Sequence, residues 1–152
     1  LSTHDVLTGL YNRNFFETEL KRFQDSRFFP VSIIVIDLDH LKQVNDLFGH
    51  ATGDEMIIRA AQVLKDTFRT EDIIARMGGD EFVVLLPTTD EAIAQEIVQR
   101  LRQRAQLQET PLLRMSIGSA CGEKECQLAE IFRQADDRMY QDKATRKEQE
   151  ME

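Results

Sequence analysis

The stretch IIARMGGDEFVVLLP, from Ile73 to Pro87, is the feature that most constrains the fold of this chain. Two apolar runs flank a Gly-Gly pair, which is typical of a β-hairpin with a tight turn. A hairpin makes part of a sheet antiparallel, so a purely parallel, doubly wound sheet is disfavoured. Asp80 and Glu81 follow the glycines directly, although acidic residues do not favour a strand. Their position therefore requires a chemical explanation.

Segments on both sides of the hairpin have the periodicity of strands and helices. The β-branched run VSIIVIDLD predicts a buried strand that ends in Asp37 and Asp39. A further strand is predicted over 112–120, and helices are predicted over 14–23, 53–68, 89–105 and 128–143. Between the first strand and the hairpin the sequence allows one or two helices. The polar tail, residues 144–152, is expected to fray. This order predicts an α/β (α+β) domain with a mixed central sheet and helices packed on it.

The length and net charge of the chain limit the kinds of function that it can have. A chain of 152 residues fits one domain, and its net charge of −8 argues against broad binding to DNA or RNA. No signal peptide and no apolar run of membrane-spanning length is visible, so no membrane contact by this domain is expected. We expect residues 1–152 to be a cytoplasmic module of a longer signalling protein, which an upstream part could anchor to a membrane. Cys121 and Cys126 fit two free thiols in a reducing cytoplasm, with a local disulfide or a metal-binding pair as the alternative.

The acidic pair of the hairpin can be explained together with Asp37 as a possible cation site. If the hairpin pairs next to the buried strand, its tip brings Asp80 and Glu81 close to Asp37. Three crowded carboxylates repel one another unless a divalent cation lies between them. An oxygen site that keeps open positions suits Mg²⁺ bound with substrate phosphates, with Mn²⁺ as an alternative. The other interpretation is that the two hairpin carboxylates are solvated charges beside a turn.

A second polar motif, DLDHLKQVNDLFGHATGD, covers residues 37–54. Lys42 could reach phosphates as a point charge. Asn45 and Asp54 could read the edge of a base, since Asp accepts from two N–H groups and Asn both donates and accepts. Taken singly, these residues equally fit helix capping and turn chemistry.

Four motifs in this order resemble the GGDEF family, the diguanylate cyclases that join two GTP molecules into cyclic di-GMP. They are DVLTGLYNR near the start, the motif of residues 37–54, RMGGDEF at residues 76–82, and SIGSA late in the chain. The resemblance covers about residues 5–147. It implies a ferredoxin-like core, similar to the palm of nucleotide polymerases and to the cyclases that make cyclic AMP.

The resemblance also implies roles for individual residues. Asp37, Asp80 and the backbone carbonyl of Leu38 would bind Mg²⁺. Glu81 would serve a second metal or help to deprotonate the attacking 3′-hydroxyl, and Lys42 would stabilise charge in the transition state. The residues implied in binding GTP are Asn45 and Asp54 at guanine, and His40, Leu41, Lys42, Gly78, Gly79, Lys143 and Lys147 near the phosphates. Lys147 replaces the usual Arg of the closing motif, and this lowers the expected affinity for phosphate, because Lys lacks the planar guanidinium.

An R-x-x-D string, RTED, precedes the hairpin at Arg69–Asp72. At this spacing it resembles the family's inhibitory site for its product, with Arg100 on the next helix as a further candidate. The alternative interpretation is an ion pair at a helix end.

The resemblance predicts a diguanylate cyclase that acts as a transient homodimer, since one set of motifs holds one GTP and the product contains two nucleotides. A non-catalytic domain that binds GTP or cyclic di-GMP and regulates a neighbour is the alternative. A phosphotransfer receiver domain fits the paired aspartates of IDLD but not the hairpin.

Overall fold

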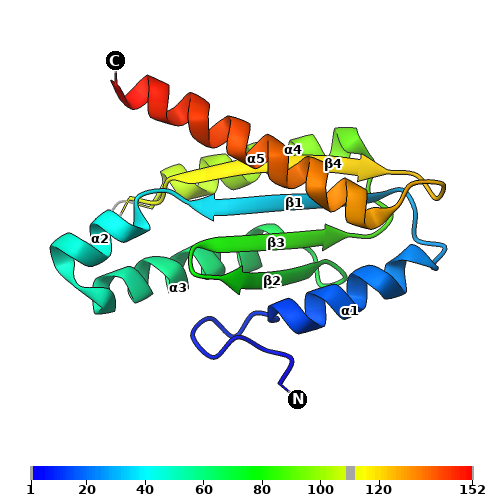
Figure 1. The fold of residues 1–152 in the computed structure, drawn as a ribbon, viewed down its shortest axis with the longest axis horizontal. Coiled ribbons are helices and arrows are strands. Elements are labelled where there is room, and N and C mark those ends of the chain that lie inside the picture. The colour runs from blue at the N-terminus through cyan, green and yellow to red at the C-terminus, as the bar shows by residue number, and fades with distance from the viewer. Residues whose placement is uncertain (1, 109–111, 152) are drawn as a thin grey trace.

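The computed structural model describes residues 2–108 and 112–151 (Figure 1). The elements follow the chain as α1 (Arg13–Gln24), β1 (Val31–Leu38), α2 (Leu41–Phe48), α3 (His50–Thr67), β2 (Ile73–Gly78), β3 (Glu81–Leu86), α4 (Glu91–Gln106), β4 (Met115–Gly122) and α5 (Leu128–Met151). The predicted order of elements is confirmed. None of the helices within the described ranges is both long and apolar enough to cross a membrane.

The sheet has the strand order β2-β3-β1-β4, and all three neighbouring pairs are antiparallel. The prediction of a mixed sheet is therefore wrong in this detail. The strands β1 and β2 run in the same direction, as do β3 and β4 (Figure 1). Because the hairpin folds β3 back between β1 and β2, parallel strands are never adjacent. This split βαββαβ arrangement is ferredoxin-like, as the resemblance implied.

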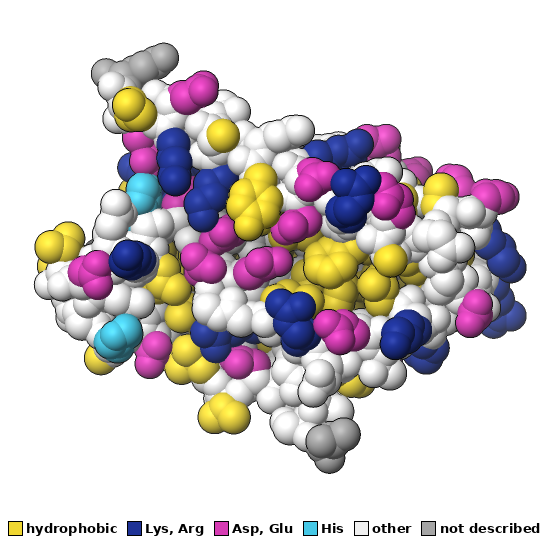
Figure 2. Space-filling view, in the orientation of Figure 1, with side chains coloured by type: hydrophobic (Ala, Val, Ile, Leu, Met, Phe, Trp, Pro, Cys, Tyr) yellow, Lys and Arg dark blue, Asp and Glu magenta, His cyan; other side chains and the backbone are white. Residues whose placement is uncertain are grey.

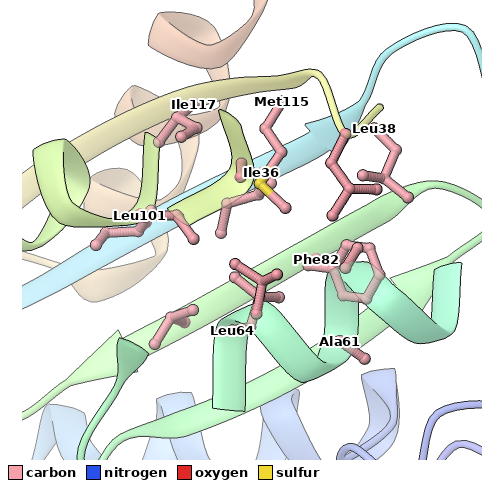
Figure 3. Close-up of a cluster of buried hydrophobic side chains, with 14 of the residues drawn as sticks. Ile36, Leu38, Ala61, Leu64, Phe82, Leu101, Met115 and Ile117 are labelled. Atoms are coloured by element: carbon pink, nitrogen blue, oxygen red, sulfur yellow. The ribbon is translucent and has the colours of Figure 1, made fainter. Parts of the chain in front are cut away.

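Helices cover both faces of the sheet because successive strand residues point to opposite sides. On one face, Ile36, Leu38 and Phe82 pack with Leu64 of α3 and Leu101 of α4 (Figure 3). The opposite face of β1 and β3 packs against α1 and α5 through a second cluster of buried residues that includes Phe16, Ile33, Val83, Ala135 and Met139. Asp37 and Glu81 continue this second face at the end of β1 and the start of β3.

The polar tail is helical instead of frayed, since α5 continues to Met151. Side chains of the last turns make contacts that stabilise this extension. Arg146 Nε lies 3.3 Å from Asp142 Oδ2. Glu150 Oε1 lies 2.8 Å from His40 Nε2 and 3.5 Å from Arg114 Nη1. Residue 152 of the predicted tail lies outside the described residues.

The hairpin turns one residue later than the sequence predicts. Gly78 pairs with Glu81, and the register shifts between Arg76 and Gly78, so the two turn residues are Gly79 and Asp80. Gly78 has φ +147° and Gly79 has φ +49°, values that side-chain-bearing residues rarely adopt. Arg76 holds the turn, since its Nε and Nη2 donate to the carbonyl of Gly79 at 3.0 and 2.9 Å.

Candidate active site

The carboxylates of the two acidic motifs meet at one end of the sheet. Asp37 is the cross-strand partner of Glu81, so both side chains lie on the face covered by α1 and α5. The tip of the hairpin is fastened to the end of β1, because Leu38 N donates to the carbonyl of Asp80 at 2.9 Å. Figure 2 shows acidic side chains gathered near the middle of this face, with basic side chains beside them.

Asp37 is the most deeply buried of these acids, with 10% of its side chain exposed. Its Oδ2 accepts a hydrogen bond from Lys143 Nζ at 3.0 Å. Its Oδ1 is buried and makes no hydrogen bond with any residue in the described ranges. Burial raises the pKa of Asp37 to about 6, opposed by the Lys143 hydrogen bond and reinforced by the charge of Asp80. A buried carboxylate oxygen without a partner is what a bound cation would satisfy.

The pKa of Glu81 depends on Asp136, a residue that the sequence did not indicate as part of the site. Burial raises the pKa of Glu81, and the next cause is the negative charge of Asp136 on α5, while Arg13 of α1 opposes it. Burial also raises the pKa of Asp136 itself. Asp136 lies in an ordinary amphipathic helix 55 positions after Glu81, and no local pattern places it near the hairpin. Only the docking of α5 on the sheet brings the two carboxylates together.

The described residues contain no group of three or more His, Cys, Asp or Glu side chains disposed to hold a metal ion. The predicted convergence of three carboxylates is therefore not present as a preformed cage. A cation at this end of the sheet would rely on Asp37, Asp80 and oxygens of the ligand. Mg²⁺ fits such a donor set, because it is usually held by one or two carboxylates together with substrate phosphates.

The loop after β1 turns sharply into helix α2. His40 has φ +68° and is the N-cap residue of α2, without a side-chain cap hydrogen bond. Leu41 is buried and Lys42 is exposed. The backbone N–H groups in the first turn of α2 have no intrahelical acceptor, and such groups favour an anion. The loop that leads into α2 leaves the same end of β1 that carries Asp37.

Asn45 and Asp54 lie on opposite sides of the corner between α2 and α3. Asn45 Oδ1 is buried and makes no hydrogen bond with a residue in the described part of the chain. A Cβ at Gly53 would overlap this oxygen, so glycine is needed there for Asn45 to point into the corner. Asp54 is exposed on the following position. Neither side chain caps α2 or α3, so helix capping does not account for either residue.

The end of α5 contributes the basic side chains of the site. Lys143 contacts Asp37, and Lys147 is exposed one turn later. A small pocket of about 30 Å³ lies between α5 and the loop after β1. Its lining residues are Asp39, His40, Lys143, Arg146, Lys147 and Glu150. Arg146 was not a predicted site residue, because the motif match assigned its position to a glycine.

Arg69 and Asp72 form an ion pair after α3, with Arg69 Nη2 3.4 Å from Asp72 Oδ1. Arg69 N donates to Asp72 Oδ2 at 2.9 Å, and Arg69 Nη2 donates to Thr89 Oγ1 at 2.8 Å. Burial raises the pKa of Asp72, opposed by its hydrogen bonds with Arg69. Arg69 nevertheless lines two cavities, of about 330 and 400 Å³. Both interpretations of this motif, a helix-end ion pair and a ligand site, therefore remain compatible with its geometry.

Arg100 is exposed on α4. One turn further along the same face of α4, Arg104 donates to Thr67 Oγ1 at 3.2 Å, at the end of α3. Arg100 therefore lies on the side of α4 that faces the end of α3, and none of the hydrogen bonds of the described residues joins it to Arg69.

Comparisons with known proteins identify the family to which the chain is related. The family model for "Diguanylate cyclase, GGDEF domain" matches residues 2–149. The diguanylate cyclase DgcM of Escherichia coli K12 is 36% identical over 146 residues, which cover 92% of this chain and 36% of DgcM. The diguanylate cyclase DosC of the same organism is 34% identical over 146 residues, which cover 90% of this chain and 32% of DosC. The chain thus spans about a third of the length of these relatives.

Solved structures show the same fold. The GGDEF domain of DgcB from Caulobacter crescentus, solved in complex with c-di-GMP, is similar with a TM-score of 0.87 and 26% sequence identity. The match covers 95% of this chain and 92% of that one. The predicted fold class is therefore confirmed.

Proposed function

The chain belongs to the diguanylate cyclase GGDEF-domain family, and we propose that it condenses two GTP molecules into cyclic di-GMP and two pyrophosphates. The observation that carries this proposal is the buried, unpartnered oxygen of Asp37, beside Asp80 and Glu81 and next to the N-terminus of α2. This arrangement offers a cation position and an anion position side by side. The chemistry that needs both together is phosphoryl transfer from a nucleotide.

In the proposed reaction, a 3′-hydroxyl attacks the α-phosphate of the other GTP. A new P–O bond forms while the bond to pyrophosphate breaks, and the proton of the hydroxyl passes to Glu81 or to solvent. Mg²⁺ held by Asp37, Asp80 and the Leu38 carbonyl would neutralise phosphate charge. The pKa of Glu81 is raised, and a higher pKa makes its carboxylate a more effective base near neutral pH.

The rest of the site would position the nucleotide. Lys42 and the backbone of His40 and Leu41 would contact the phosphates, and the open backbone at Gly78 and Gly79 would let the nucleotide approach. Asn45 and Asp54 would hydrogen-bond guanine, and the unpartnered Asn45 Oδ1 supports this role. Lys143 and Lys147 would add positive charge from α5.

We further propose that two copies of the domain meet transiently, because each copy offers one such site and two bonds must form. Product inhibition is proposed at Arg69 and Asp72, with Arg100 nearby, supported by the two cavities that Arg69 lines. Since GTP is the substrate, the same proposal locates the domain in the cytoplasm.

The test is incubation of the pure chain with GTP and Mg²⁺, followed by chromatography for cyclic di-GMP. The expected result is product from the wild type and none from Asp80→Ala. Asp137→Ala, which removes an exposed acid of α5, is the matched control and should keep wild-type turnover. Tight GTP binding without turnover by the wild type would instead identify a non-catalytic receptor, and equal turnover by Asp80→Ala would refute the assigned metal ligand.

A further inference from the structure

We propose that Ser116 is a positioning residue: its buried hydroxyl holds the carboxylate of Asp39, and this contact fixes the turn at which helix α2 begins. The inference rests on the proposed function, because the start of α2 is where the phosphates of GTP would bind. It gives a physical role to the first residue of the SIGSA motif, residues 116–120. The proposed catalytic and binding residues leave that motif unexplained.

Ser116 lies in a row of residues that crosses the sheet at its acidic end. Asp37 of β1 pairs with Glu81 of β3 on one side and with Ser116 of β4 on the other, so the three side chains share one face. Ser116 is fully buried. Its Oγ donates to Asp39 Oδ1 at 2.7 Å, whereas Asp37 Oδ1 has no hydrogen-bond partner among the described residues. The hydroxyl therefore serves Asp39 and leaves the proposed metal ligand open.

Asp39 is fastened to the beginning of β4 through its side chain and its backbone. Its N donates to the carbonyl of Arg114 at 2.8 Å, and its carboxylate accepts from Ser116, two positions further on. Asp39 as a whole is only 6% exposed. A buried carboxylate is costly without a hydrogen bond, and a bond to a charged acceptor is stronger than one between neutral groups. Loss of the Ser116 hydroxyl would therefore drive the Asp39 carboxylate toward water.

The turn that follows Asp39 has an unusual backbone conformation. His40 has φ +68°, which residues with a side chain rarely adopt. His40 is the N-cap of α2 but makes no side-chain cap hydrogen bond. Its carbonyl accepts from Val44 N at 3.0 Å, in the first turn of the helix. Such a conformation persists only where the surrounding structure enforces it, and the buried anchor directly before it is Asp39.

A second contact of the turn is weaker. The ring Nε2 of His40 lies 2.8 Å from Glu150 Oε1, but about a third of each side chain is exposed, 33% and 34%. Ion pairs that solvent reaches contribute little and are screened by salt. The hydrogen bond between Ser116 and Asp39 is shielded from both effects because it is buried. It is therefore the main constraint on the direction in which the first N–H groups of α2 point.

The rival explanation is that the Ser116 hydroxyl only stabilises the fold as a whole. In that case its removal would make global unfolding easier, but the folded protein would keep its affinity for the nucleotide. The proposed role instead predicts a local change at the start of α2 and a weaker nucleotide complex. The two explanations therefore differ in hydrogen exchange and in binding.

The first experiment is amide hydrogen exchange of the whole chain, followed by NMR without any ligand. Val44 reports the first turn of α2, and Val35, in the middle of the central strand β1, reports the stability of the core. Ser116→Ala should raise the exchange rate of Val44 relative to that of Val35 by at least about fivefold, because local opening exposes Val44 alone. A purely global effect would speed exchange at Val35 at least as much.

The second experiment is calorimetric titration with Mg²⁺ and the unreactive α,β-methylene analogue of GTP. Ser116→Ala should weaken binding by about tenfold. Asp39→Ala should weaken it to a similar degree, and the double variant should bind about as well as Asp39→Ala, because Ser116 acts through Asp39. Ser116→Cys, which keeps the size of the side chain but has a weaker donor, should lose at least about threefold.

Ser119→Ala is the matched control within the same motif. Ser119 is also buried, at 8% exposed, but its Oγ accepts from Gln95 Nε2 of α4 at 3.0 Å. This variant should bind the analogue within about twofold of wild type and leave the relative exchange at Val44 unchanged.

The inference is overturned if Ser116→Ala and Ser116→Cys both keep wild-type affinity and wild-type relative exchange at Val44. It is also overturned if the losses of Ser116→Ala and Asp39→Ala multiply in the double variant, or if Ser119→Ala loses as much affinity as Ser116→Ala. If the wild type itself does not bind the analogue, the proposed function fails, while the exchange of Val44 still tests whether Ser116 holds the turn.

Discussion

Replacing Asp37 with Asn tests whether the site is built around a carboxylate that the fold disfavours without a cation. Burial raises the pKa of Asp37 to about 6, from an ordinary value of about 3.9. A difference of about 2 in pKa corresponds to about 3 kcal/mol that the metal-free fold loses when Asp37 ionises. Asn avoids this cost but weakens the contact with Lys143, so we expect a net gain of about 1–2 kcal/mol near pH 8.

The sign follows from the direction of the pKa shift. The folded state holds the Asp37 proton more tightly than the unfolded state, so the wild type loses stability as the pH rises from about 4 to about 6. Below about pH 4 the residue is protonated in both states and the advantage of Asn disappears. For a chain of this size, the expected gain raises Tm by about 2–8 °C near pH 8.

The assay is thermal unfolding of both proteins between pH 4 and pH 8, with and without Mg²⁺ and the unreactive GTP analogue. Ligand should raise the Tm of the wild type by mass action and have little effect on Asp37→Asn. Asp137→Asn serves as the control, since this exposed acid pairs only at the surface and its loss should change stability by at most about 0.5 kcal/mol. An Asp37→Asn protein that is less stable than wild type near pH 8, or equally stabilised by ligand, would refute the reasoning.

Three further predictions concern substrate, product and assembly. The wild type should prefer GTP over ATP by a factor of up to about 10⁴, because adenine would leave the polar groups of Asn45 and Asp54 without partners. In competition assays, Asn45→Ala should lose most of this preference. Equal use of ATP by the wild type would exclude these residues as the guanine-binding groups. Added cyclic di-GMP should inhibit the wild type but not Arg69→Ala in steady-state assays, and equal inhibition of the two would leave RTED as a helix-end ion pair. Specific activity should rise with enzyme concentration until dimers dominate, whereas a flat profile over monomeric protein by light scattering would contradict the two-copy mechanism.

The sequence alone determined the type and order of the elements, because these depend on local periodicity. The apolar run before Asp37, the amphipathic spacing of the helices and the Gly-Gly hairpin each predict an element close to its observed position, except that α5 continues through the predicted tail to Met151. The same local reading selected Asp80, Glu81 and Asn45 as candidates, because polar side chains beside apolar runs suggest a chemical role. Arg69 was selected only through the motif resemblance. The motif resemblance then supplied the chemistry that connects them.

Tertiary structure alone decided how distant elements meet. The contact between Lys143 and Asp37 spans 106 positions, and it exists because α5 docks across the end of β1. The same docking brings Asp136 to Glu81. The insertion of β3 between β1 and β2 makes the sheet wholly antiparallel. Strand pairing and helix docking minimise the exposed apolar surface of the whole chain, so no local pattern of residues contains this information.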